Sequence, residues 1–412
     1  MKFELPRAGE RKYNSSLELF RDLFWGRTTK SGILINDETA LKATAALACV
    51  RAITDGISQV PFRLMRKKGD QRAPVEDDSR QDRFSWDANE LQTAAEFWDT
   101  VGIRTTLRGS SLVWKNMSRV GGGEIMELIP IPKFRVEQKK DGSLKFYGTL
   151  ADDREVVLPN NEVWYIKGPS YNVAHALDPV KLAAEAIGLS LVAEQHAAES
   201  FSSGLNLDGV LTTDASLTKE QRAGMRKSWL DAHEKEGGAM SRIAMLSNGV
   251  TFIPMSGKNT DGQLIENRKF QIEEICRAFK VIPLMVGYSD KTATYASAEQ
   301  MFIAHVVHTL SPWYRRLDLS AGVNMLSPKE RRGGFYFKFF ANALMRGSMQ
   351  ARADYATKMY NIGAVNPNEV REWDDLNPYE GGDQYRVPLN MKDPNDPAPE
   401  DPNKKPEEEN AN

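Results

Sequence analysis

Residues 261–317 read DGQLIENRKFQIEEICRAFKVIPLMVGYSDKTATYASAEQMFIAHVVHTLSPWYRRL, a pattern that predicts two helices joined by a polar loop. Apolar residues recur at helical spacing just before Pro283 and predict a helix that ends near that proline: Ile272, Ile275, Cys276 and Phe279. Residues 287–297 then form a polar loop with no core of its own. A second helix carries a broad apolar face from Met301 to Leu310, and Pro312 is expected to bend it or to end its first half.

The length and charge of the chain limit what it can be. With 412 residues, of which 41% are hydrophobic, it can form two or three domains or one elongated domain with insertions. Lys and Arg number 54 against 56 Asp and Glu, so the formal net charge is −2. Such a chain has no overall attraction to nucleic acid, and any DNA contact must be local or geometric.

Cysteine usage and the terminus indicate the compartment. Cys49 and Cys276 are far apart in the sequence and each lies in an apolar helical context, which predicts neither a disulfide framework nor a structural zinc site. We therefore expect a reducing environment during folding. The N-terminus has no apolar signal core, and no run of about 18 apolar residues occurs, so neither secretion nor membrane spanning is expected.

The first half of the chain predicts an α+β region with an antiparallel sheet. Residues 67–83 are charged and poor in apolar residues, which predicts a loop. Asp141-Gly142 is a hairpin signal, and the glycines at 121–123 read as another turn. The predicted helices are 36–60 and 93–107, and the predicted strands are 62–65, 111–117, 124–131, 134–139, 144–149, 155–158 and 163–166.

A small module is predicted between two long helices. Asp178 followed by Pro179 starts a helix that runs to about Ser203. A compact strand, helix and strand pair follow over 208–212, 218–234, 243–246 and 251–255, before the helix of the opening stretch begins. Beyond that stretch, a strand is predicted at 334–340 and helices at 348–361 and 366–373. The polar tail from Met391 is expected to be disordered.

Few residues suggest chemistry. The phosphate-binding and nucleophile motifs are absent from the sequence, so no catalytic or cofactor site is predicted. His305 and His308 are three residues apart without a third ligand nearby, which favours packing over a metal site. The acid pairs 273–274 and 374–375 are adjacent in the sequence, and helical geometry would splay them apart.

Two segments could contact nucleic acid. Residues 313–316 (WYRR) mix aromatic and basic side chains, although an amphipathic helix end with Arg near the C-terminal dipole is the favoured interpretation. The loop at 288–295 combines small hydroxyl residues with one lysine and suits a sequence-independent phosphate contact; an ordinary surface loop is equally compatible. Its candidate contact residues are Ser289, Asp290, Lys291, Thr292 and Thr294.

Six blocks of sequence, in order, resemble the HK97-type portal protein family of tailed bacteriophages. The likeness extends from about Ala40 to Asp383. The blocks are 46–51 (ALACVR) with Val60-Pro61, 264–279 (LIENRKFQIEEICRAF) with Pro283, 293–295 (ATY) with Glu299-Gln300, 308–313 (HTLSPW), 366–371 (NPNEVR) and 380–383 (EGGD).

The resemblance implies a structural protein, not an enzyme, without cofactors. Portal proteins of this family form a ring, usually of twelve subunits, at one capsid vertex of the virion, and double-stranded DNA is packed and ejected through its channel. The implied partners are other copies of the chain, the terminase large subunit, a head–tail adaptor, and capsid and scaffold proteins, without a membrane. Assembly would take place in the host cytoplasm.

The resemblance also implies a division of the chain into an elongated subunit. In sequence order it comprises an N-terminal arm (1–35), a wing (36–177), stem helix 1 (178–207), a small α/β clip (208–257), stem helix 2 (258–282), a tunnel loop (283–297), a kinked wing helix with a strand (298–345), a crown-like helical region (346–390) and an acidic tail (391–412). The tunnel loop and stem helix 2 would line the channel. The stem candidates are Lys258, Arg268, Lys269, Glu273 and Glu274.

Two other classes of function remain open from the residues alone. One is a nucleic-acid hydrolase that depends on a metal or a carboxylate, in which His305 or Glu299 would be required for activity. The other is a DNA-binding module that acts as a monomer or dimer. The small net charge disfavours the second, which would need a steep salt dependence of DNA binding.

Overall fold

The structure is a computed structural model that describes residues 27–118, 123–149, 154–202, 209–213, 218–224, 250–254, 260–288, 295–341, 344, 349–374 and 376–385. The chain forms two units, Met1–Ala341 (unit 1) and Asn342–Asn412 (unit 2). The predicted N-terminal arm up to residue 26, the predicted strand at 243–246, most of the predicted helix at 218–234 and the acidic tail lie outside the described residues. No helix in the described part is both long and apolar enough to cross a membrane.

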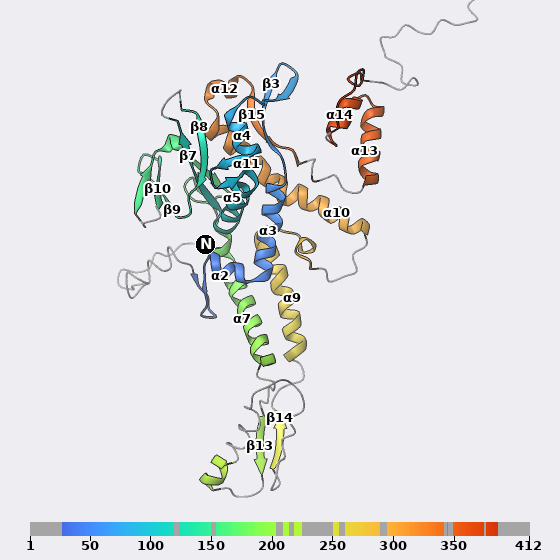
Figure 1. Cartoon of the computed structure of the whole chain (residues 1–412). Coiled ribbons are helices and arrows are strands. Elements are labelled where there is room, and N and C mark those ends of the chain that lie inside the picture. Colours follow the sequence, from blue (N-terminus) through green and yellow to red (C-terminus); the bar gives the residue numbers. More distant parts are fainter. Residues whose placement is uncertain are drawn as a thin grey trace, which may run out of the picture. The chain divides into compact units, whose positions relative to one another are not determined.

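Unit 1 is built from helices and small antiparallel sheets (Figure 1). The strands pair in the orders β15-β3-β4, β12-β7-β8, β11-β10-β9, β13-β14, β1-β2 and β5-β6. Their bounds are β1 Arg27–Thr28, β2 Leu34–Ile35, β3 Phe62–Lys68, β4 Gln71–Pro74, β5 Asp87–Asn89, β6 Gln92–Thr93, β7 Ser110–Met117, β8 Ile125–Pro130, β9 Phe134–Gln138, β10 Leu144–Thr149, β11 Glu155–Leu158, β12 Val163–Lys167, β13 Gly209–Thr213, β14 Val250–Pro254 and β15 Phe335–Phe339. The α+β class is confirmed.

The helices of unit 1 surround and extend this sheet region. They are α2 Asp37–Lys42, α3 Thr44–Ser58, α4 Ser79–Ser85, α5 Ala94–Arg108, α6 Pro179–Leu182, α7 Ala184–Ser202, α9 Thr260–Phe279, α10 Tyr295–His305, α11 Ser311–Met325 and α12 Pro328–Arg332. Short 3₁₀ helices occur at Asn160–Glu162 (η2) and Pro283–Val286 (η3), and the π-helix η4 spans Val306–Leu310.

Two of the predicted long helices are broken near their starts. The helix predicted at 36–60 is two helices, because Ala43 adopts an extended conformation (ψ 111°) between α2 and α3. The helix predicted from Asp178 is likewise α6 and α7, separated at Ala183. The helix start predicted at Asp178 is correct, since Asp178 accepts from Lys181 N–H (2.9 Å). Asn36 caps α2 in the same way by accepting from Thr39 N–H (2.8 Å). The breaks were missed because alanine favours helix and marks no stop.

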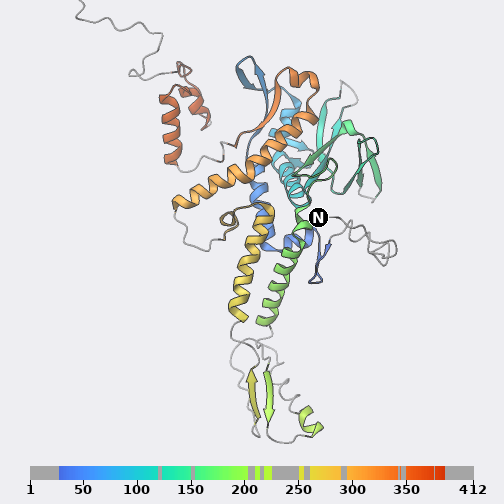
Figure 2. The same ribbon diagram turned by 180° about the vertical axis from the view of Figure 1, so that it is seen from behind.

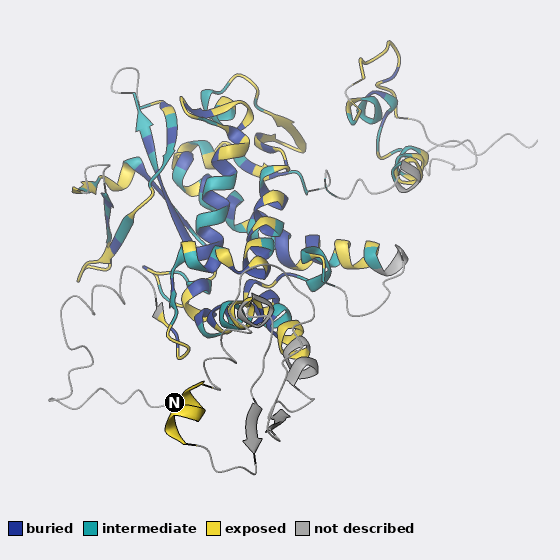
Figure 3. Ribbon diagram, turned by 60° about the horizontal axis from the view of Figure 1, so that its bottom comes forward, coloured by how far each residue is buried: buried dark blue, intermediate teal, exposed yellow. Residues whose placement is uncertain are grey.

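The core of unit 1 is an aromatic cluster between α3, α5 and the sheets. Phe62 of β3 stacks on Phe337 of β15 with ring centroids 5.2 Å apart, and Trp98 of α5 meets Phe62 edge-on at 5.2 Å. Trp164 of β12 is fully buried, and its indole N–H donates to Ser320 Oγ of α11 (2.9 Å). Figure 3 shows the buried residues concentrated inside this body. The cluster therefore packs elements that are far apart in the sequence, such as β3 and β15, into one core.

The prediction that residues 67–83 form a loop is wrong. The segment contains the end of β3, all of β4 and most of α4. All four residues of β4 are exposed, so no apolar alternation marks the strand. Helix α4 has seven residues, is capped by Asp78, and buries Phe84 in the aromatic cluster. Strand β4 is stabilised by backbone pairing with β3, which leaves no apolar pattern in the sequence.

The predicted interruption near Pro312 takes the form of a π-helix. Ser311 N–H donates to Val306 O, five residues earlier, and Ser311 Oγ donates to the same carbonyl at 3.0 Å. Pro312, which has no N–H, lies in the first turn of α11, where its donor is not needed. The wider turn of the π-helix and Pro312 thus both lie where η4 meets α11.

Asp318 of α11, which contacts β15, should make the stability of the fold depend on pH. Its carboxylate accepts from Phe339 N–H (2.9 Å), and burial raises its pKa from 3.8 to about 7. The folded state therefore binds the proton more tightly than the unfolded state. The resulting stability is present below pH 4 and is lost as the pH rises toward 7. Asp318→Asn should make the free energy of unfolding, measured by urea titration, less dependent on pH in this window; an unchanged pH profile would contradict this assignment.

Unit 2 contains the helices α13 Met349–Asn361 and α14 Pro367–Glu372. Arg352 donates to Trp373 O (2.8 Å) and forms an ion pair with Asp374. Asn368 Nδ2 donates to Asp383 Oδ1 (2.8 Å), and a Cβ at Gly382 would lie 2.3 Å from Asn368 Oδ1. The sequence blocks 366–371 and 380–383 therefore fold against each other, and a side chain at Gly382 would not fit.

Candidate functional site

Two long helices flank the predicted insertion. Helices α7 and α9 lie side by side in both views (Figures 1 and 2), and α9 also packs on α3. The buried face of α9 consists of Gln271, Ile275, Cys276 and Phe279. Of the segment between the two helices, the described part includes β13 and β14, which pair over five residues each. The predicted order of helix, inserted strands and helix is confirmed.

The described stem candidates lie on α9 outside its buried face. Arg268 and Lys269 are exposed, whereas Glu273 and Glu274 are half-buried. Glu273 forms an ion pair with Arg277 one turn later (3.1 Å), and Arg277 also lies over the ring of Phe270 (5.3 Å). Lys258 lies outside the described residues. The structure therefore places four of the five stem candidates on one helix, and their contact with DNA stays a prediction.

The candidate loop at 288–295 lies between η3 and the start of α10 in the sequence. Lys280 has φ +58° after the last turn of α9, and its carbonyl accepts from Thr309 Oγ1 of η4 (2.8 Å). Gly287 (φ +78°) then ends η3, where Tyr288 N–H donates to Pro283 O (3.1 Å). Residues 289–294, which include all five loop candidates, lie outside the described residues. Their phosphate contact also stays a prediction.

Helix α10 presents apolar side chains to solvent in the single chain. Met301, Phe302, Ile303 and Val307 are 40%, 37%, 41% and 47% exposed. Figure 1 shows α10 extending away from the body of unit 1. Three consecutive positions spread over about 200° of a helix, and the described part of unit 1 leaves all three of these apolar side chains partly exposed. This surface, Met301–Ile303 with Val307, is called the α10 apolar surface below.

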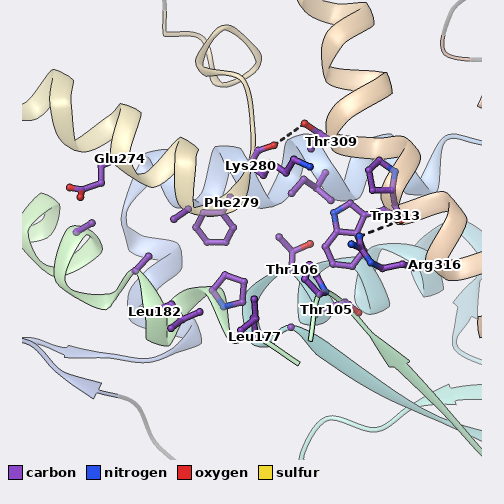
Figure 4. Close-up of a pocket in the computed structure, with 18 of the residues that line it drawn as sticks. Thr105, Thr106, Leu177, Leu182, Glu274, Phe279, Lys280, Thr309, Trp313 and Arg316 are labelled. Carbon is purple, nitrogen blue, oxygen red and sulfur yellow. Dashed lines mark hydrogen bonds between the residues drawn. The ribbon is translucent and has the colours of Figure 1, made fainter. Parts of the chain in front are cut away.

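A cavity of about 500 Å³ lies where the N-terminal end of α7 and the C-terminal end of α9 meet α5 and α11 (Figure 4). Its lining is mainly apolar, with Leu182, Phe279 and Trp313 among the larger side chains. Arg316 stacks on Trp313 (5.6 Å) and, together with Glu274 and Lys280, supplies charge at the cavity.

The histidines and cysteines considered for chemistry differ in burial. His305 is buried (3% exposed), and burial lowers its pKa, whereas His308 is exposed. Within the described residues, no group of three or more histidine, cysteine or acidic side chains is arranged to hold a metal ion. The two cysteines are an unexpected pair: Cys49 Sγ lies 3.7 Å from Cys276 Sγ, both are buried and both are free thiols. The contact with Cys276 and, to a smaller extent, burial raise the pKa of the Cys49 thiol.

The interpretation of residues 313–316 as a helix end is wrong. They lie in the first turns of α11, because the π-helix and Pro312 restart the α-helical pattern just before them. Tyr314 is buried and donates to Gly56 O of α3. Arg315, the next residue, is exposed. The segment is therefore neither a uniform patch nor a C-terminal cap.

The family model described as Phage portal protein matches residues 44–375. The chain belongs to the phage portal protein family. This portal chain is 26% identical over 359 residues to the portal protein of Enterobacteria phage HK97, a match that covers 85% of the chain and 82% of that protein. The portal role, passage of DNA through a channel at the capsid vertex, follows from the family.

Solved structures show the same portal fold. A crystal structure of an HK97 family phage portal protein from Corynebacterium diphtheriae aligns with a TM-score of 0.52 and 15% identity over 77% of this portal chain and 99% of that one. A chain from "Neck of native GTA particle computed with C12 symmetry" aligns with a TM-score of 0.52 and 17% identity over 88% and 94%. The portal family is structural.

Proposed function

We propose that the portal chain assembles into a ring of twelve copies around double-stranded DNA. The observation that carries the proposal is the match over residues 44–375 together with the order of α7, inserted strands, α9, loop and α10. In this arrangement α9 and the loop at 283–297 line the channel, with Arg268, Lys269, Glu273, Glu274 and the predicted loop residues nearest the DNA. The near-neutral chain allows DNA to slide, since each additional lysine–phosphate contact would add affinity.

The α10 apolar surface supports the ring. Its four side chains are 37% to 47% exposed in the single chain, and a neighbouring copy in a ring would cover them. A closed ring needs two different surfaces that fit each other, one on each side of every subunit. A projecting apolar helix and the mainly apolar cavity near Trp313 give the chain one convex and one concave surface.

The remaining parts of the proposal concern partners and location. The clip at 208–257 would meet the terminase large subunit during packaging and the head–tail adaptor afterwards. The wing (36–177 and 298–345) would contact capsid and scaffold proteins, and 346–390 would form the crown-like region. The energy for packaging would come from the terminase partner. Assembly would take place in the host cytoplasm before the ring becomes part of the virion.

Electron microscopy and native mass spectrometry of the purified full chain test the ring directly. We expect ring particles with a central channel and a mass of twelve subunits of 46.2 kDa. Rings with another subunit number would correct the stoichiometry alone. Monomers under every assembly condition would contradict the proposed function.

Lys291→Glu tests the loop. A ring repeats this one lysine once per subunit, which gives a circle of weak contacts around the DNA. The variant should assemble normally and should change the yield of packaged DNA or the rate of ejection, measured as nuclease-protected DNA per particle. Lys140→Glu, at the exposed turn between β9 and β10, is the matched control. Normal packaging by Lys291→Glu would remove the loop from the mechanism.

A further inference from the structure

A basic groove lies between the β15-β3-β4 sheet and the helices α11 and α12. The groove encloses about 490 Å³. Five cations line it, Lys67, Arg72, Arg315, Arg331 and Lys338, against one carboxylate, Asp318. All five cationic residues are exposed. A chain with a net charge of −2 thus gathers positive charge at one place.

Strand pairing places like charges directly opposite each other. Lys67 of β3 pairs with Arg72 of β4, and Arg63 of β3 pairs with Lys338 of β15. Residues 63 and 67 are four apart on one strand, so both pairs lie on the same face of the sheet. Opposed like charges destabilise a sheet unless an anion lies between them. The strand register therefore creates a row of unneutralised charge.

The acidic residues near the groove do not neutralise this row. Asp318 is bonded to Phe339 N–H, and its pKa is raised by burial even though Arg315 and Lys338 both act to lower it. Glu330 of α12 pairs instead with Arg80 (2.7 Å), which also donates to Met325 O (3.0 Å). In the described part of the chain, no ion pair within 4.0 Å includes Arg63 or any of the five cations that line the groove.

The position of the groove suggests what its counter-ion is. Within unit 1, the β3–β4 hairpin and α12 lie at the end opposite to the end from which α7 and α9 extend (Figures 1 and 2). The proposed clip, inserted between those two helices, faces the packaging motor, so the basic end faces the DNA that has already passed through. The cations of β3 also form a row, about 13 Å from residue 63 to 67 at about 3.3 Å per residue. A row suits a polyanion better than a small anion, for which the cations would converge.

We propose that this groove binds the phosphate backbone of packaged double-stranded DNA, independently of sequence, outside the channel. The proposal rests on the proposed function, because that function brings a duplex to this end of the chain. A duplex carries one charge per about 1.7 Å of its axis, so a row of this length can meet several phosphates. Arginine and lysine side chains on strands, without a convergent pocket for bases, supply affinity and no sequence preference.

The experiment compares two double variants of the full chain that change the net charge equally. Lys67→Glu with Arg72→Glu alters the groove, and Lys139→Glu with Lys140→Glu alters the exposed turn between β9 and β10. Fluorescence anisotropy with a 30-base-pair duplex at a series of salt concentrations measures binding. We expect the groove variant to bind about tenfold more weakly, with a slope of log affinity against log salt shallower by about two, and the control to bind like the unmodified chain.

Three results would overturn the proposal: unchanged duplex binding by the groove variant, an equal loss in the control, or loss of binding to a polyglutamate peptide while duplex binding is retained. Circular dichroism checks that each variant is folded. If the charge reversals unfold the hairpin, Arg331→Gln with Lys338→Gln replaces them and should give a smaller loss in the same direction. Duplex binding is measured whether or not rings form, so a failure of this inference is distinguished from a failure of the ring, which electron microscopy reports.

Discussion

Ile303→Asp is expected to leave the portal chain monomeric. Ile303 is 41% exposed at the centre of the α10 apolar surface, and the proposed ring buries this surface against the next subunit. Moving an unpaired carboxylate into an apolar contact costs several kcal/mol, on the order of 3 or more, and the cost recurs at every interface of the ring. Light scattering coupled to size-exclusion chromatography should show the mass of one chain where the unmodified protein gives a ring.

A matched control separates the interface from general effects of a new charge. Val157 of β11 is 53% exposed, and Val157→Asp places the same side chain on a different surface of unit 1. This control should assemble like the unmodified chain. If Ile303→Asp forms rings of normal mass while circular dichroism shows a folded chain, the α10 apolar surface is not part of the subunit interface.

Gly109→Ala is expected to reduce the free energy of unfolding by about 3 kcal/mol or more, since it combines backbone strain with overpacking. Gly109 joins α5 to β7 with φ +77°, and a Cβ there would lie 1.8 Å from the carbonyl oxygen of Leu177. Gly109 O also accepts from Gly168 N–H (2.7 Å), so the backbone cannot move away without losing this bond. Urea denaturation followed by tryptophan fluorescence measures the loss.

Gly142→Ala isolates the cost of the backbone conformation. Gly142 has φ +83° in the turn between β9 and β10, and no atom lies within 4 Å of the position that a Cβ would take there. This variant should lose only about 1 to 2 kcal/mol, the cost of a left-handed conformation for a residue with a Cβ. Equal losses at the two glycines would show that the contact with Leu177 is not what makes Gly109 necessary.

Much of the fold could be predicted because its elements carry strong local signals. Capping residues such as Asn36 and Asp178 mark helix starts, and alternation marks the strand β15. The elements that were missed are held by other forces. Strand β4 exists through backbone pairing with β3, and α4 through the burial of one side chain, Phe84. Neither leaves a periodic pattern in the sequence.

The candidate site could be predicted only where it depends on chain order. The sequence of long helix, insertion, long helix and loop is visible before folding, and so is the family resemblance. Contacts between distant residues are not: Cys49 and Cys276 meet although 227 positions separate them. The basic groove likewise joins β3 and β4 to Arg315 and Lys338, and the average charge of the chain conceals it. Only the tertiary fold gathers these residues.

The π-helix η4 sets the rotation of α10 relative to α11. Each residue of an α-helix turns the side chains by about 100°, so one additional residue in a turn shifts the phase of everything before it. The five residues Val306–Leu310 therefore set the angle between the side chains of α10 and those of α11 in an otherwise continuous helical segment. Removing one of them would point the side chains of α10 in a new direction while α11 kept its place in the core. The number of residues in η4 thus determines which side chains of α10 face the neighbouring subunit in the proposed ring.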